Sequence, residues 1–377
     1  MMVVLPTIQA YSTKYQRMDL VFDVYQPSSL KAETRTKRGR GVRRRVESKG
    51  KIPQNWQNFL RNNDNKTELF NFLADKISQM STPNTVIVTR ENDVVASNHE
   101  VSMDGLAPCC HEEADTRIFV HARNAAEEGS KILMIKANDT DVLVIAISVL
   151  SALQDIGLQQ LWVAFGQGQH LKWIAVHDLQ NSIGPEKSKG ILFFHAFTGC
   201  DVVSGFRGKG KKSAWQTWDV CPEASDVFIK LSQYPPTVDD DDLKTLEKFV
   251  VTMYDRSSTA AGVDDARLDL FARKQGTYEA IPPTRAALLQ HAKRAAYEAG
   301  CIWSQSTLRQ PETQNPADWG WTKKGDLWQV FWTTLPPIAE SCQQLTKCAC
   351  KSECCGRCKC YRFGLTCSAL CSCKCDD

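Results

Sequence analysis

The stretch from Lys131 to Leu143 has the sequence KILMIKANDTDVL. Its first seven residues form a nearly continuous apolar run, which is typical of a strand buried inside a parallel sheet. Asp139 and Asp141 follow at once, and residues two apart on an extended segment point the same way. The stretch therefore predicts a buried strand that ends in a pair of carboxylates.

The segments on either side of this strand predict an alternation of helices and strands. An amphipathic helix is expected over residues 111–128 and another over residues 142–155, and the next strand over residues 161–165. The order strand–helix–strand predicts an α/β fold, in which a parallel sheet with right-handed crossovers is flanked by helices.

The rest of the chain contains further periodic segments and a tryptophan-rich stretch. Strands are expected over 18–25 and 85–89, and helices over 53–80, 172–182, 189–199, 240–254 and 283–300. Residues 303–334 carry five tryptophans and few periodic signals, so we expect this stretch to wrap around another part of the protein.

Acidic residues stand where the predicted strands end and the helices begin. Ligand sites of open α/β sheets lie at the carboxyl ends of the strands. Clustered carboxylates need cations, and Mg²⁺ or Mn²⁺ prefers such oxygen ligands. Two such ions can activate water and stabilise the leaving oxygen of a phosphodiester. Each acid alone is more often a solvated cap, but as a set beside apolar segments they favour a site. The set is Asp23, Glu113, Asp115, Asp139, Asp141 and Asp201.

Three motifs in this order resemble the flap endonucleases of the PIN-like nuclease superfamily. Residues 113–115 (Glu-Ala-Asp), the apolar strand and residues 139–141 are similar to the family's internal nuclease motif. Asp201 with the glycine-rich residues 205–214 resembles an Asp followed by a helix-two-turn-helix that holds duplex backbone. Asp23 with the basic stretch after it resembles the second-strand Asp that leads into a basic arch.

The resemblance implies a PIN-like parallel sheet and a metal-dependent endonuclease that hydrolyses phosphodiesters. The six acids would then be catalytic ligands of Mg²⁺ or Mn²⁺. The family also carries an Asp on its first strand, and Asp19 is too close to Asp23 to be that residue. We therefore expect either an incomplete site or a chain that is truncated at its N-terminus.

Two basic segments are candidates for nucleic-acid binding, because lysine and arginine neutralise phosphates. Residues 31–51 contain ten Lys/Arg and two Glu. A nuclear-localisation signal or a solvated helix face is the alternative, but an arm over a nucleic-acid backbone fits the neighbouring acids better. Residues 205–212 mimic a P-loop, but Lys212 stands where Ser or Thr should hold Mg²⁺. The candidates in the two segments are Arg38, Arg40, Arg43, Arg44, Arg45, Arg207, Lys209, Lys211 and Lys212.

Sixteen cysteines are unevenly distributed, and ten of them lie between Cys348 and Cys375. A dense cluster behind a cysteine-poor body predicts a reducing compartment and a metal site rather than disulfides. Thiolates at this density suit Zn²⁺, and nine of them could hold about three ions if three bridge. Two separate four-cysteine sites are the alternative. The nine predicted ligands are Cys348, Cys350, Cys354, Cys358, Cys360, Cys367, Cys371, Cys373 and Cys375.

The cysteine pattern resembles the tesmin-type CXC domain, a zinc-binding module that recognises DNA. The resemblance implies that Lys359, Tyr361 and Arg362 approach the DNA. Cys355 is an extra cysteine, and a second copy of the repeat is absent from the sequence.

Together these patterns predict a nuclease domain over residues 1–224, a mostly helical Trp-rich region over 225–340 and a zinc domain over 341–377. The predicted function is a metal-dependent endonuclease that a zinc module delivers to DNA, in the nucleus, as in mobile-element-derived proteins. The alternatives are a degenerate nuclease fold that serves as a zinc-dependent DNA-binding scaffold, and a zinc store. No apolar run of 18 residues occurs, so no membrane span is expected.

Overall fold

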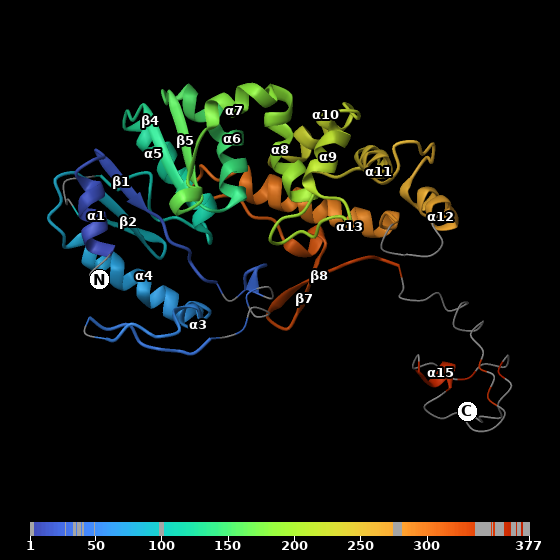
Figure 1. Cartoon of the computed structure of the whole chain (residues 1–377), viewed down its shortest axis with the longest axis horizontal. Coiled ribbons are helices and arrows are strands. Elements are labelled where there is room, and N and C mark those ends of the chain that lie inside the picture. The colour runs from blue at the N-terminus through green and yellow to red at the C-terminus, as the bar shows by residue number, and fades with distance from the viewer. Residues whose placement is uncertain are drawn as a thin grey trace. The chain divides into compact units, whose positions relative to one another are not determined.

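A computed structural model of the chain divides into two compact units, residues 1–332 and 333–377 (Figure 1). It describes residues 4–26, 28–32, 35, 39, 41–48, 50–97, 102–273 and 281–335, and then 348, 350, 358–362, 367 and 371. Of Lys359 and Arg362 it describes the backbone alone. Among these residues, no helix is both long and apolar enough to cross a membrane.

The N-terminal part of the first unit contains a three-stranded sheet. Strand β1 (Arg17–Leu20) pairs in parallel with β2 (Thr85–Arg90), which pairs antiparallel with β3 (Asp93–Ala96). Helices α1 (Val4–Ser12) and α4 (Asn63–Ser78) bury apolar side chains against β2, and the short α3 (Trp56–Leu60) precedes α4. Thr89, in β2, accepts a hydrogen bond from the backbone N of Phe22, which directs the chain beyond β1 towards Asp23.

A second three-stranded sheet follows α5 (Ala114–Glu127). Strand β4 (Ile132–Ala137) pairs in parallel with β5 (Gln160–Phe165), and β5 pairs antiparallel with β6 (Lys172–Ala175). The right-handed crossover expected between β4 and β5 is occupied by α6 (Thr140–Asp155).

The structure is therefore a mixed α/β fold with small sheets rather than one parallel sheet. Among the described strands, only β1–β2 and β4–β5 pair in parallel. Strand β4 is also not fully buried as expected: it ends the order β4-β5-β6, and alternate side chains, those of Ile132 and Met134, are exposed. The helix expected over 172–182 is half wrong, because β6 precedes α7 (Val176–Ile183).

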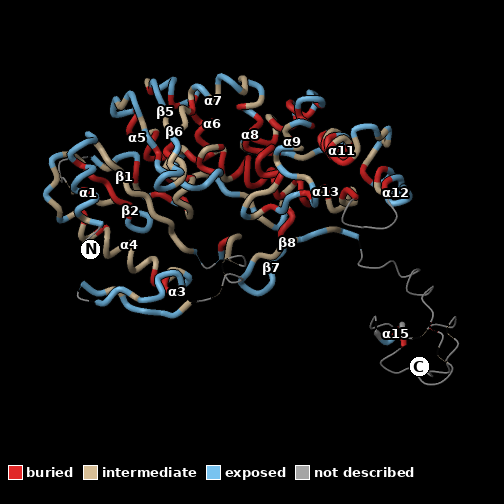
Figure 2. Tube along the Cα trace, in the orientation of Figure 1, coloured by how far each residue is buried: buried red, intermediate tan, exposed pale blue. Residues whose placement is uncertain are grey.

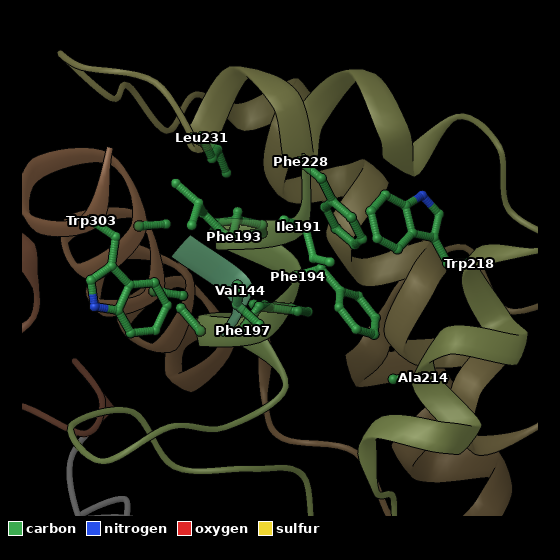
Figure 3. Packing of buried hydrophobic residues seen from close by; sticks show 14 of the residues in the cluster. Val144, Ile191, Phe193, Phe194, Phe197, Ala214, Trp218, Phe228, Leu231 and Trp303 are labelled. Carbon is green, nitrogen blue, oxygen red and sulfur yellow. The ribbon is translucent and has the colours of Figure 1, made fainter. Parts of the chain in front are cut away.

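Helices build most of the core of the first unit. The aromatic side chains of α8 (Pro185–Phe197) pack against α6, α10 (Ala224–Leu231), α11 (Asp240–Tyr254) and α13 (Arg285–Ala296). Figure 3 shows Phe193, Phe194 and Phe197 interleaved with Trp218 and Phe228. Figure 2 shows the buried stretches concentrated in these helices. Two smaller helices, α9 (Lys211–Trp218) and α12 (Val263–Arg273), complete this part.

The helices on both sides of residue 225 share this one core. After α13 the backbone continues as a π-helix, Tyr297–Trp303. The stretch expected to wrap then forms a hairpin that the sequence analysis missed, β7 (Trp321–Lys324) and β8 (Leu327–Val330). Its Trp321 packs with Tyr297 and with Leu30 from the start of the basic segment. In the second unit the described helix is α15 (Lys359–Arg362).

Candidate metal sites

Two helix N-termini carry four of the predicted acids. Asp139 caps α6, and its Oδ1 accepts a hydrogen bond of 3.0 Å from the backbone N of Asp141. Glu113 makes no side-chain cap on α5, but Oδ1 of Asp23 accepts a 2.9 Å hydrogen bond from the backbone N of Ala114. The first turn of a helix favours negative charge, so both positions reduce the cost of collecting carboxylates.

Asp141 is held by a histidine from another helix. It is buried, and its Oδ1 lies 2.9 Å from Nε2 of His195 in α8. This contact fixes the orientation of the carboxyl group, and it ties the end of β4 to the α8 segment that leads to Asp201. His195 therefore positions a predicted ligand.

A lysine lies among the acids. The ammonium nitrogen of Lys31 is 2.6 Å from Oε1 and 2.7 Å from Oε2 of Glu113, and 3.7 Å from Oδ2 of Asp201. Burial alone would lower the pKa of Lys31, but the charges of Glu113, Glu298 and Asp201 raise it. Lys31 therefore stays protonated and acts as the counter-ion of the site.

Two carboxyl groups of this site are costly to ionise. Burial, and after it the negative charges of Asp139, Glu113 and Asp23, raise the pKa of Asp115 to about 7. Burial also raises the pKa of Glu298 to about 8, supported by Glu113, Asp141 and Asp201 and opposed by Lys31. A second positive charge near these groups would stabilise their ionised forms.

The sequence analysis missed Glu298 and the role of Lys31. Glu298 is buried in the π-helix, and such helices occur often at functional sites. It is the single charged residue between Arg294 and Arg309, a signal that was present in the sequence. Lys31 is one of ten basic residues in its stretch, and no local pattern distinguishes it from the others.

Each of the six predicted acids interacts electrostatically with another of them, with Lys31 or with Glu298, although the acids come from separate elements. Oxygen donors in this number fit a divalent cation such as Mg²⁺ or Mn²⁺. In the described part of the chain, no three of these carboxylates bring ligand oxygens within 4.8 Å of one another. Lys31 lies among them in this structure, and Arg35 also contacts Glu113, at 3.9 Å.

The predicted phosphate-binding residues of the glycine-rich stretch have different surroundings. Lys211 donates to the backbone O of His195 at 2.6 Å and to Oγ1 of Thr198 at 3.0 Å, at the C-terminus of α8. Burial lowers the pKa of Lys211 to about 8. Lys209 lies over the ring of Tyr254, with its Nζ 5.3 Å from the centroid. The other two residues of the set, Arg207 and Lys212, are exposed.

Part of the basic segment lies along α4. Arg43 contacts Oδ1 of Asn65 at 3.0 Å and Oε2 of Glu68 at 2.6 Å, and Asn65 is buried. Arg44 and Arg45 are exposed. The other two predicted contacts, Arg38 and Arg40, lie outside the described residues.

The second unit contains a cluster of thiols. One sulfur atom from each of Cys348, Cys358, Cys360 and Cys367 lies within 4.8 Å of the others. Sγ of Cys371 is 3.8 Å from Sγ of Cys360, and Sγ of Cys348 is 3.9 Å from Sγ of Cys367. A tetrahedral zinc site with ~2.3 Å bonds has neighbouring sulfur atoms about 3.8 Å apart. The cluster therefore fits Zn²⁺.

The remaining predictions for this unit are placed only in part. Cys350 packs against the cluster, whereas Cys354, Cys373 and Cys375 lie outside the described residues. The ring of Tyr361 is exposed, as a contact residue requires. The side chains of Lys359 and Arg362 are not described.

Comparison of the chain with protein-family models, with curated proteins and with solved structures found no match.

Proposed function

We propose that the first unit is a divalent-metal-dependent endonuclease that hydrolyses phosphodiester bonds. The observation that carries this proposal is the interaction of Lys31 with carboxylates from three separate segments, those of Glu113, Asp201 and Glu298. The charges of Asp23, Asp139 and Asp141 act in turn on Asp115 or Glu298. Burial and, after it, mutual repulsion make such a group costly to ionise, and the pKa values of Asp115 and Glu298 are raised for these two reasons. A fold retains such a group more readily when a cation and its substrate use it.

The residues of the chain have distinct roles in this proposal. Asp139 and Asp141 are held by a helix cap and by His195, so they are positioned before any ligand binds. Asp201 is half exposed and lies at the entrance, where a substrate phosphate arrives. The carboxyl group of Glu298 is deep in the site and holds its proton below a pH of about 8.

A divalent cation held by these carboxylates would supply Lewis-acid stabilisation of the phosphodiester and would lower the pKa of water. The exposed Arg44, Arg45, Arg207 and Lys212 would contact phosphates along the strand. Binding of this kind weakens steeply as the salt concentration rises.

We assign DNA binding to the second unit. A thiolate cluster that fits zinc can fold so short a segment, because metal binding supplies the folding free energy. The exposed Tyr361 supplies an aromatic ring near this cluster. The proposed role of the unit is to deliver the nuclease to DNA in the nucleus.

The test is cleavage of labelled flap, hairpin and single-stranded DNA by the full chain with Mn²⁺. The variant Asp139→Asn/Asp141→Asn removes two charges, yet an amide oxygen can still cap α6 and face His195. We expect cleavage by the wild type and its loss in this variant. Asp178→Asn is the matched control, because Asp178 is an exposed acid in the first turn of α7.

A DNA-binding scaffold is the second candidate. It is favoured by Lys31, which already neutralises Glu113, and by the spacing of the carboxylate oxygens. Zinc-dependent DNA binding without cleavage under any of these conditions would establish the scaffold instead.

A further inference from the structure

A pocket of about 240 Å³ opens beside Asp201. Three tryptophans line it, Trp321, Trp328 and Trp332. Leu30, Arg294, residues 200–204 and Val330 form the rest of its wall. It is smaller than the ~300–1,000 Å³ of sites that hold drug-sized ligands. Asp201 belongs to this pocket and also faces Lys31 in the carboxylate site, so the two sites adjoin.

Arg294 is a buried cation in the wall of this pocket. Its side chain is 2% exposed, and Nη1 donates to the backbone O of Phe331 at 2.8 Å and of Gly320 at 3.2 Å. Among the described residues, no carboxylate raises the pKa of Arg294, and burial lowers it to about 10. Buried charges are ordinarily paired, so this guanidinium favours an anionic ligand.

The aromatic side chains of the pocket indicate that the anionic ligand also carries a planar group. The guanidinium carbon of Arg294 lies 5.5 Å from the ring centroid of Trp332, which is 61% exposed. An exposed indole next to a buried cation offers a stacking face and a phosphate contact at neighbouring positions. A nucleotide carries both complementary groups, a base and a phosphate.

We propose that this pocket binds one unpaired nucleotide of the nucleic-acid strand, next to the phosphodiester that reaches the carboxylate site. Its base stacks on Trp332 and its phosphate pairs with Arg294. The proposal rests on the nuclease function proposed above, because it is the shared Asp201 that places this nucleotide beside the bond to be cut. The pocket would thereby select strands with an unpaired nucleotide at that position.

The test measures binding to the full chain with Ca²⁺ in place of Mn²⁺, so that no cleavage is needed. The probe is a short single-stranded oligonucleotide with 2-aminopurine at successive positions, whose fluorescence falls on stacking. We expect one position to be quenched, and Trp332→Ala to abolish that quenching and weaken binding roughly 5- to 100-fold. Trp173→Ala is the matched control, because Trp173 is 53% exposed and does not line the pocket.

Further measurements distinguish a nucleic-acid strand from a free nucleotide or phosphate as the ligand. They also distinguish failure of the pocket proposal from failure of the nuclease proposal. An abasic residue at the quenched position should weaken binding to the wild type, and this comparison needs no mutant to fold. The same abasic residue should leave binding by Trp332→Ala unchanged. Competition by the mononucleotide dAMP that is as strong as competition by the strand would overturn the proposal that the pocket binds a strand. Competition by inorganic phosphate alone would overturn it as well. Equal binding by wild type and Trp332→Ala, with cleavage intact, would overturn the pocket alone. Quenching without any cleavage would overturn the nuclease and keep the pocket.

Discussion

The ammonium nitrogen of Lys31 lies 2.6 Å from Oε1 of Glu113 and 3.7 Å from Oδ2 of Asp201. The chain thus supplies its own cation where the proposed function requires a divalent one. A univalent ammonium neutralises fewer of these carboxylates than a divalent ion. Lys31 and an incoming metal ion therefore compete for Glu113 and Asp201.

We predict that Lys31→Met tightens Mn²⁺ binding by roughly tenfold or more. The variant removes the repulsion between the ammonium group of Lys31 and the bound Mn²⁺. Two like charges about 4 Å apart repel each other by several kcal/mol at an effective dielectric constant of about 20. Titration calorimetry or Mn²⁺ electron paramagnetic resonance measures this affinity. Lys51→Met is the control, since Lys51 is an exposed lysine of the same basic segment. Unchanged or weaker Mn²⁺ binding in Lys31→Met would contradict the competition.

We predict that Asp115→Asn stabilises the metal-free protein at pH 8 but not at pH 4. The pKa of Asp115 is raised from 3.8 to about 7, first by burial and then by its acidic neighbours. The folded chain therefore keeps a proton between these values that the unfolded chain has lost. The contribution of this carboxyl group to the free energy of unfolding is fully present below about pH 4 and is lost as the pH rises through 7.

Thermal unfolding in EDTA at both pH values measures this effect, with an expected rise in Tm of several degrees at pH 8. The same variant should lose the rise in Tm that Mn²⁺ gives the wild type. If the Tm difference between Asp115→Asn and the wild type does not depend on pH, ionisation of Asp115 does not destabilise the fold. Asp178→Asn again controls for the loss of an acid in a first helical turn.

We predict that the protein loses stability as the pH falls from 6.5 to 4, in part through His291. This residue lies in the core, and its Nε2 is 2.7 Å from the backbone O of Phe197. Burial, and after it the charge of Arg294, lowers its pKa from 6.5 to about 4. The unfolded chain gains a proton in this range that the folded chain does not, so acid favours unfolding.

The expected loss from this one group is about 2 kcal/mol between pH 8 and pH 5. Urea denaturation of the wild type and of His291→Gln at the two pH values isolates it. The variant is expected to be less stable at pH 8 but to lose less on acidification. An equal pH dependence in both proteins would remove His291 from the explanation.

The sequence predicted the elements around the acids well, because their signals are local. The apolar run before Asp139 and the helical periodicity after it correspond to β4 and α6. The continuous apolar run also gave a wrong expectation, full burial. Whether Ile132 faces a neighbouring strand or solvent depends on the strand order, which no local pattern encodes.

The composition of the site was harder to predict for the same reason. The acids could be listed because each stands beside an element boundary in the sequence. Lys31 joins them through contacts with residues far along the chain, among them Glu113, 82 residues away. Glu298 joins them through a π-helix, whose extra residue per turn changes which side of the helix a residue occupies.

The last prediction concerns zinc in the second unit. We expect the purified chain to carry two or three Zn²⁺ ions, and Cys360→Ser to lose at least one of them. Cys360 is buried, and its sulfur atom lies among those of three other cysteines within 4.8 Å, so its loss removes one thiolate from a four-sulfur site. Elemental analysis of the protein gives the stoichiometry, and Co²⁺ substitution reports thiolate coordination through its visible absorption. Cys110→Ser is the control, because Cys110 is an exposed thiol of the first unit.

The number of zinc ions distinguishes two arrangements of the cluster. Three ions would favour bridging thiolates, and two would favour separate four-cysteine sites. Removal of zinc by a chelator should unfold this unit and abolish its DNA binding while the Tm of the first unit stays unchanged. Zinc that binds without affecting DNA affinity would instead support a storage role for the cluster.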